Sequence, residues 1–304
     1  MPSEPRHADE PAGREVLAPD RQSGGADPAP VAPGATRSAG AGLLAPGEPA
    51  PYEIVNADGA APVVLLCDHA SRFIPSALDS LGLGQAELSR HIAWDIGIAD
   101  VTRRLSEAMD APGVLSRFSR LIVDPNRALD DPTLVPRISD GVIVPSNRDL
   151  APAQIRRRLD AFHRPYHAAI ERVIEDKVAA GRNGGRLPVL VSMHSFTPVI
   201  KGTERPWQIG ILWNRDPRIP EPLMARLRAE GIVVGDNQPY SGRDNHGYTL
   251  HVHAEPRGLA NVLIEVRQDL IDTHQGAAEW TRRIRDALRH VLDDPGNYRA
   301  WSGA

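Results

Sequence analysis

The alternation of short apolar runs with longer amphipathic stretches is the feature that most constrains the fold of this chain. Each short run has the length of a buried strand, and each long stretch repeats its apolar residues with helical periodicity. This alternation is typical of an α/β domain built on one large sheet. We expect about eight strands, at residues 63–67, 114–118, 121–123, 188–193, 208–213, 232–235, 248–252 and 262–266.

Three stretches carry the clearest helical pattern. They cover residues 99–109, 152–180 and 277–292. In the second stretch, apolar residues recur at near-helical spacing with charged residues between them. Pro165 lies inside this stretch and predicts a bend there, because a proline within a helix removes a backbone hydrogen bond.

Composition divides the chain into one domain and two tails. Residues 1–50 are rich in Pro, Ala, Gly and Ser and have few large apolar side chains, so they bury too little surface to offset the entropy lost on ordering. We therefore expect a disordered N-terminal tail at 1–50, a single domain at 51–296 and a short tail at 297–304.

Charge, cysteine content and hydropathy exclude several classes of function. The net charge is -4 and the basic residues form no extended face, so nucleic acid is not the expected partner. Cys67 is the only cysteine, which rules out a disulfide framework or a thiolate metal cluster within one chain. No apolar run approaches the ~20 residues that span a bilayer, and the first residues do not form a secretion signal. We therefore expect a cytoplasmic protein without a membrane partner.

Two histidines stand where an α/β sheet places its ligands. His69 follows the predicted strand at 63–67, and His194 follows the one at 188–193. Because ligands bind beyond the carboxyl ends of such strands, the two neutral imidazoles are expected to converge on one metal ion. Either histidine alone could equally be a structural residue.

A catalytic zinc ion commonly takes a carboxylate as its third protein ligand. Asp95 is our candidate, because an acidic residue between Trp94 and Ile96 is costly to bury unless it is paired or bound to metal. The alternative is that Asp95 caps a helix that begins near Gly97.

Two other pairs of histidines compete for a metal. His163 and His167 have ligand spacing on the predicted helix, but Pro165 lies between them and no acidic residue is adjacent. His251 and His253 would share one face of the predicted strand at 248–252, and they could instead contact substrate or lie at the rim of the site.

Charged residues in two other apolar runs are candidates for catalysis and substrate binding. Burial of Glu265 in its run would raise the pKa of the carboxyl toward the range of a general base, although an ion pair with Arg267 is an alternative. Arg127, and less so Arg120, could bind a substrate carboxylate through paired hydrogen bonds. Either arginine could instead form a structural ion pair.

The ordered set of these motifs resembles the N-formylglutamate amidohydrolase family from about residue 52 to 292. The motifs are His69 after a strand, Trp94-Asp95, Asp124-Pro125-Asn126-Arg127, Met193-His194-Ser195 and the segment 264–270. That family is similar in fold to zinc carboxypeptidases and to deacylases of acidic amino acids. The resemblance implies a phosphorylase/hydrolase-like three-layer α/β sandwich with a central mixed sheet.

The chain departs from those enzymes at the first metal-ligand motif. They carry a His-x-x-Glu motif, whereas the third position after His69 is Arg72 here. The third ligand is therefore assigned to Asp95, and the resemblance implies one zinc ion per chain in a catalytic domain at 51–296.

The resemblance also implies an activity. Zinc-activated water would cleave N-formyl-L-glutamate to formate and L-glutamate, a step of histidine degradation. The alternatives are a deacylase or peptidase for another N-acyl acidic amino acid or γ-glutamyl substrate, and an inactive relative that only binds metal or ligand. We expect these residues to take part: metal ligands His69, Asp95 and His194; proton transfer and oxyanion contact Glu265 and Arg120; substrate contacts Asn126, Arg127, Arg243, Arg267, Tyr248 and His253.

Overall fold

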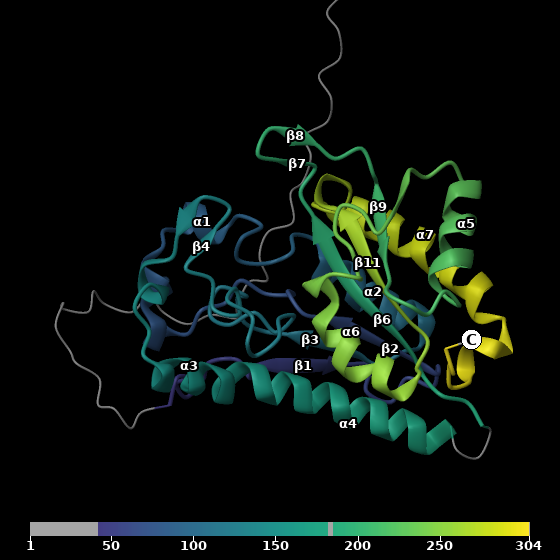
Figure 1. Cartoon of the computed structure of the whole chain (residues 1–304), viewed down its shortest axis with the longest axis horizontal. Helices are drawn as coiled ribbons and strands as arrows, with labels where there is room; N and C mark the ends of the chain where they lie inside the picture. The colour runs from purple at the N-terminus through teal and green to yellow at the C-terminus, as the bar shows by residue number, and fades with distance from the viewer. Residues whose placement is uncertain (1–41, 182–184, 304) are drawn as a thin grey trace, which may run out of the picture.

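The computed structural model describes residues 42–181 and 185–303, which form an α/β fold around a sheet of seven strands (Figure 1). In spatial order the strands are β1 (Tyr52–Val55), β3 (Gly113–Ser116), β2 (Val63–Cys67), β6 (Val189–Phe196), β11 (Asn261–Arg267), β9 (Ile209–Leu212) and β10 (Val234–Asp236). The four strands from β3 to β11 run parallel, whereas β1 at one edge and the pair β9 and β10 at the other run in the opposite direction. The sheet is therefore mixed, as expected.

Helices cover both faces of the sheet and complete three layers. One face packs against α2 (Ile98–Met109), α5 (Pro220–Ala229) and α7 (His274–Leu292), and the other against α4 (Arg164–Gly181) and α6 (Tyr248–His253). Strand β2 contributes to the core on both faces, because successive side chains of a strand point to opposite faces of the sheet. Its residues 63, 65 and 67 join the core beneath α2, and residues 64 and 66 join the core beneath α4.

The remaining elements are short and lie in the connections. They are α1 (Gln85–Leu88), the hairpin of β4 (Ile138–Ser139) and β5 (Val142–Ile143), the hairpin of β7 (Val199–Ile200) and β8 (Thr203–Glu204), and 3-10 helices at Ser76–Gly82, Pro145–Asn147, Asn245–Gly247, Glu255–Arg257, Gln268–Leu270 and Pro295–Tyr298.

Two of the predicted strands are wrong, and one strand of the seven-stranded sheet was missed, as were the four short hairpin strands. Residues 121–123 form a turn in which the amide of Ile122 donates to the carbonyl of Ser119, and the run is apolar because the turn is buried. Residues 248–252 belong to helix α6, since periodicity cannot separate a strand from a helix in so short a run. The missed strand is β1, which extends the sheet by pairing with β3.

The long predicted helix is present with an interruption. It consists of α3 (Pro152–Arg158), a π-helical turn (Leu159–His163) and α4. Pro165 lacks the amide hydrogen that would pair with a carbonyl one turn earlier, and a π-helical turn is a common way to accommodate such a break. The interruption therefore lies just before the proline at which we expected a bend.

Both ends of the described chain contact the domain. Residues 1–41 of the predicted N-terminal tail lie outside the described residues, but Leu43 and Leu44 pack against the core. In the predicted C-terminal tail, the hydroxyl of Tyr298 donates to the carbonyl of Leu292, and the amide of Trp301 donates to Gly258. Within the described residues, none of the helices has the length and apolar character needed to cross a membrane.

Candidate metal centre

Three adjacent parallel strands bring the candidate residues together at one edge of the sheet. His69 lies two residues beyond the end of β2, His194 lies in β6, and Glu265 lies in β11. His194 and Glu265 face each other in the register of β6 and β11. The order β2, β6, β11 in space therefore places side chains from distant parts of the sequence at one site.

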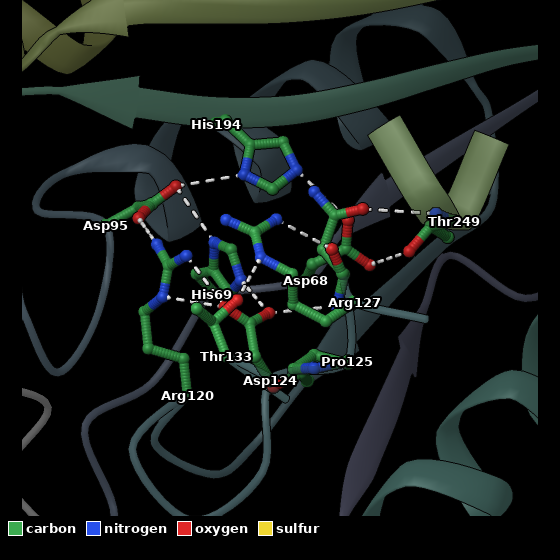
Figure 2. A network of polar contacts seen from close by, with 12 residues as sticks. Asp68, His69, Asp95, Arg120, Asp124, Pro125, Arg127, Thr133, His194 and Thr249 are labelled. Carbon is green, nitrogen blue, oxygen red and sulfur yellow. Dashed lines mark hydrogen bonds and ion pairs between the residues drawn. The ribbon is translucent and has the colours of Figure 1, made fainter. Parts of the chain in front are cut away.

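His69, Asp95 and His194 form the candidate metal-binding group (Figure 2). The Oδ2 atom of Asp95 lies 3.4 Å from Nδ1 of His69 and 3.0 Å from Nδ1 of His194. One ligand atom from each of the three residues lies within 4.8 Å of the other two, and all three residues are buried. Two imidazole nitrogens and one carboxylate oxygen are a donor set that suits a zinc ion or a similar divalent metal.

Carboxylates on the outer side of the histidines fix the orientation of both rings. Nε2 of His69 lies 2.7 Å from Oδ1 of Asp124, and Nε2 of His194 lies 3.0 Å from Oδ2 of Asp68. A carboxylate accepts hydrogen bonds, so each Nε2 carries a proton, and each Nδ1 can present its lone pair to a metal when the ring is neutral. This arrangement is the one by which proteins orient metal-binding histidines, and it supports the fit of the group to a metal.

The carboxylate of Asp95 is held by its neighbours and does not cap a helix. The amide of Ser195 donates to Oδ2 at 3.2 Å, and Nη1 of Arg120 donates to Oδ1 at 3.3 Å. Helix α2 has Gly97 at its N-cap position instead. Gly97 has φ of 81° and a Cβ there would lie 2.2 Å from the carbonyl oxygen of Ile271, so only glycine fits where Asp95 turns into the site.

The charges of the site shift the pKa values of its groups strongly. Burial alone would raise the pKa of Asp95, but the two histidines outweigh it and hold the pKa well below its usual range. Burial alone would lower the pKa of His194, but its hydrogen bonds and charge contacts with Asp68 and Asp95 raise it to about 10. Without a bound metal, the histidines and carboxylates therefore compensate one another.

Glu265 has the environment that we expected for a general base. Its side chain is 6% exposed, and its Oε2 atom has no hydrogen-bond partner among the described residues. Burial raises the pKa of Glu265 to about 7, with a further contribution from the charge of Asp95. Arg267 does not pair with Glu265, since its Nε donates to Asp269 at 2.8 Å.

A polar pocket of about 110 Å³ opens beside these groups. Arg120 lies in its wall, where Nε and Nη2 donate to Oδ2 of Asp124 at 3.1 and 2.7 Å. The expected substrate contacts Asn126 and Arg127 also line the pocket. The lining residues are His69, His91, Asp95, Arg120, Asn126, Arg127, His194, Ser195, Phe196, Thr197, Tyr240, His246, Glu265 and Gln268.

Four of the expected substrate contacts do not line this pocket. Arg243 is exposed and lies over the ring of Trp213, and Arg267 is held by Asp269. Tyr248 lies beside the rings of His163 and His167. His253 is also remote, because the segment that we expected as a strand forms a helix and turns this residue toward α4.

Our reading of the sequence did not assign several residues of the site. Asp68 and Asp124 hold the histidines, and their signal was an acidic side chain at the end of an apolar run. Tyr240 and His246 line the pocket from a segment without any recognisable motif, and Gln268 lines it from the segment 264–270, in which we assigned it no role. No local pattern indicates that these segments reach the ends of β2 and β6.

The rival histidine pairs do not form a metal site among the residues described. His251 is 67% exposed in its side chain and pairs with Glu255 in the 3-10 helix that follows α6. The rings of His163 and His167 are tilted against each other with centroids 4.3 Å apart, and Nδ1 of His167 lies 2.8 Å from Nε2 of His253. The group of His69, Asp95 and His194 is the one with metal-binding geometry in the described part of the chain.

Comparison with known proteins assigns the family. The crystal structure of gene product Atu2144 from Agrobacterium tumefaciens is 37% identical, with a TM-score of 0.79 over 83% of this chain and 98% of that chain. The crystal structure of N-formylglutamate amidohydrolase from Ralstonia eutropha JMP134 is 21% identical, with a TM-score of 0.63 over 80% of this chain and 98% of that chain, and shows the same fold. No curated protein sequence matched. The family model for N-formylglutamate amidohydrolase matches residues 61–272, which include every residue of the metal-binding group, and the chain therefore belongs to the N-formylglutamate amidohydrolase family.

Proposed function

We propose that this protein is a zinc-dependent amidohydrolase that cleaves N-formyl-L-glutamate to formate and L-glutamate. The observation that carries the proposal is the arrangement of His69, Asp95 and His194 beside Glu265. Both histidines turn Nδ1 toward one carboxylate oxygen while carboxylates hold their outer nitrogens. One zinc ion held by these three residues would acidify a water molecule and polarise the formyl carbonyl.

Glu265 is the group that would move the proton. It lines the pocket with an unpartnered carboxylate oxygen, and its raised pKa of about 7 suits a base that works near neutrality. The carboxylate would take a proton from the attacking water. The protonated carboxyl would then deliver that proton to the amide nitrogen as the C–N bond breaks, so that glutamate leaves as a neutral amine and formate as the acid fragment.

Arg120 would stabilise the oxyanion while it orders the site. Three of its N–H groups are directed at Asp95 and Asp124, which fixes the guanidinium in the pocket wall. The remaining N–H groups of the guanidinium are available to the oxygen of the attacked carbonyl. A cation fixed in this way needs no rearrangement when negative charge develops.

The walls of the pocket suit an acidic substrate of small size. Arg127 and Asn126 supply donors for a carboxylate on the side of Asp124. On the opposite side Nη2 of Arg205 donates to the hydroxyl oxygen of Tyr240 at 3.2 Å, so the phenolic hydrogen of Tyr240 is free to donate elsewhere. Burial raises the pKa of Tyr240, which keeps that hydrogen in place.

The test is release of formate by purified protein before and after removal of metal. We expect turnover of N-formyl-L-glutamate that is lost with a chelator and restored by Zn²⁺, with slower turnover of the N-acetyl and N-succinyl analogues. His194→Ala should abolish both zinc binding and turnover, whereas His251→Ala, at an exposed histidine, should change neither. Preference for a larger acyl group would indicate another deacylase, and zinc binding without turnover of any analogue would indicate a binding protein.

A further inference from the structure

One face of α4 lies behind the metal centre and contacts the residues that support it. The hydroxyl of Tyr166 donates to Oδ1 of Asp68 at 2.9 Å, and His163 forms a hydrogen bond with the backbone of Arg127. Nε2 of His167 lies 2.9 Å from the carbonyl oxygen of Pro125. His163 ends the π-helical turn, and Tyr166 and His167 follow it; such turns often occur at functional sites.

The contacts of His167 determine its protonation. The carbonyl oxygen of Pro125 only accepts, so Nε2 of His167 carries the proton and donates it. Burial and the nearby His163 and His253 lower the pKa of His167 to about 3, so the ring is neutral and its Nδ1 is an acceptor. Nδ1 lies 2.8 Å from Nε2 of His253, and the two rings stack with their planes 18° apart.

The peptide that His167 holds lies between two residues of the site. Oδ1 of Asp124 accepts from Nε2 of His69 and from the amide of Asn126 at 2.9 Å. Oδ1 of Asn126 in turn accepts from the amide of Thr249 at 3.1 Å, on the same helix as His253. The segment 124–126 is thus tied to α4 by His167 and to α6 by Thr249.

We propose that His167 is a positioning residue for the metal centre. Its ring bridges the carbonyl of Pro125 and the imidazole of His253, and this bridge fixes the backbone from which Asp124 reaches His69. The mechanism above does not use His167, which touches neither the pocket nor the metal ligands. The inference rests on the proposed metal centre, because the function that it assigns to His167 is to orient His69, a ligand of that centre.

Two substitutions separate the two contacts of the ring. His167→Gln keeps a donor at the reach of Nε2 and retains the hydrogen bond to Pro125. His167→Asn is too short for that bond. Val173→Ala is the control for general weakening of α4, since Val173 is buried two turns further along the same helix.

The measurement is the dissociation constant for Zn²⁺, obtained by competition with a chelating dye, together with the absorption bands of the Co²⁺-loaded protein. Loss of an outer contact of a metal ligand costs about 10- to 100-fold in metal affinity. His167 acts on the metal ligand through one further peptide, so for His167→Asn we expect a loss of zinc affinity at the low end of this range, about 10-fold. We also expect altered Co²⁺ absorption bands in this variant. His167→Gln and Val173→Ala should stay within about threefold of the unsubstituted protein. Equal losses in His167→Asn and Val173→Ala, or no loss in His167→Asn, would overturn the proposal.

A measurement on the unsubstituted protein covers the case in which His167→Asn does not fold. Nitrogen-15 NMR of the histidine side chains at neutral pH should show His167 as a neutral ring protonated at Nε2. Protonation at Nδ1, or an imidazolium, would overturn the assignment of the Pro125 contact. A protein that shows the expected ring but binds no Zn²⁺ would refute the proposed metal centre, and with it the positioning function, while leaving the contact itself intact.

Discussion

Neutralising Asp68 tests whether the outer carboxylates set the ring orientation of the metal-binding histidines. Oδ1 of Asp68 accepts from the hydroxyls of Tyr166 and Thr249, both at 2.9 Å, while Oδ2 faces Nε2 of His194 at 3.0 Å and accepts from the hydroxyl of Ser192 at 3.4 Å. In Asp68→Asn the side chain has only one oxygen, and this oxygen accepts from both Tyr166 and Thr249 when it takes the position of Oδ1. The amide nitrogen then occupies the position of Oδ2 and donates to His194.

This change removes one of the two carboxylate charges that raise the pKa of His194, and it reverses the tautomer that the neutral ring of His194 adopts. Its Nε2 must become an acceptor, so the proton moves to Nδ1, the atom that faces Asp95 and the metal position. The loss of an outer partner of a metal-binding histidine costs about 10- to 100-fold in metal affinity, or about 1.4–2.8 kcal/mol. We expect the upper part of this range, because both the charge and the tautomer change.

The assay is competition for Zn²⁺ between the metal-free protein and a chelating dye, with the tautomer of His194 observed by nitrogen-15 NMR. Asp216→Asn is the matched control, since Asp216 is also buried but pairs with Arg218 away from the pocket. It should lower stability without changing the zinc affinity. An Asp68→Asn protein that binds Zn²⁺ within threefold of the unsubstituted protein and keeps the proton on Nε2 would refute the reasoning.

Four further predictions concern the charged groups of the site. Glu265→Gln should lower kcat by about 100- to 10,000-fold while zinc affinity changes little. Steady-state kinetics on zinc-loaded protein would measure this loss. Unchanged turnover would exclude Glu265 as the base. The working form of Glu265 is the carboxylate, and its pKa is raised from 4.5 to about 7, so kcat/KM should fall as pH decreases. The midpoint of this fall should lie between these two values, because a bound cation favours the carboxylate. The fall at low pH should be absent from the residual activity of Glu265→Gln. The pKa of His194 is raised to about 10 in the metal-free protein, so zinc binding at pH 7 must displace a proton. Calorimetry of zinc binding in buffers of different ionisation enthalpy should detect the release of this proton. A binding enthalpy that does not depend on the buffer would contradict this protonation state. Arg127→Lys should raise KM for N-formyl-L-glutamate by about 10-fold with a smaller effect on kcat, because lysine cannot donate two parallel hydrogen bonds to a carboxylate; steady-state kinetics would refute this with an unchanged KM.

The fold was predictable where the pattern of the sequence is long or strongly apolar. Strand β2 and helix α2 were placed to within one residue. Burial on both faces leaves a continuous apolar run in β2, and burial on one face leaves helical periodicity in α2. The segment 248–252 failed because five residues with mixed polarity fit a strand and a helical turn equally well. Its polar residues face other parts of the chain, and only those contacts select the helix.

The candidate site was predictable to a similar extent. His69, His194 and Glu265 could be found because each is polar or charged at the end of, or inside, an apolar run. Their convergence followed from the rule that parallel strands present their carboxyl ends at one edge. Tyr240 and His246 could not be found in this way, since no local pattern marks a loop residue as part of a pocket wall.

The sequence by itself determined that this chain forms an α/β domain and which polar residues are expensive to bury within it. Whether a residue lies in an apolar run is a local property, so its burial can be predicted without knowing which residues surround it in space. The tertiary structure alone decided which partners compensate that burial: Asp68 for His194, Asp124 for His69, and the histidine on α4 that holds the peptide beyond Asp124. These pairings depend on the order of strands in space and on the path of the loops between them, and residues more than forty positions apart in the sequence carry no local signal of their contact.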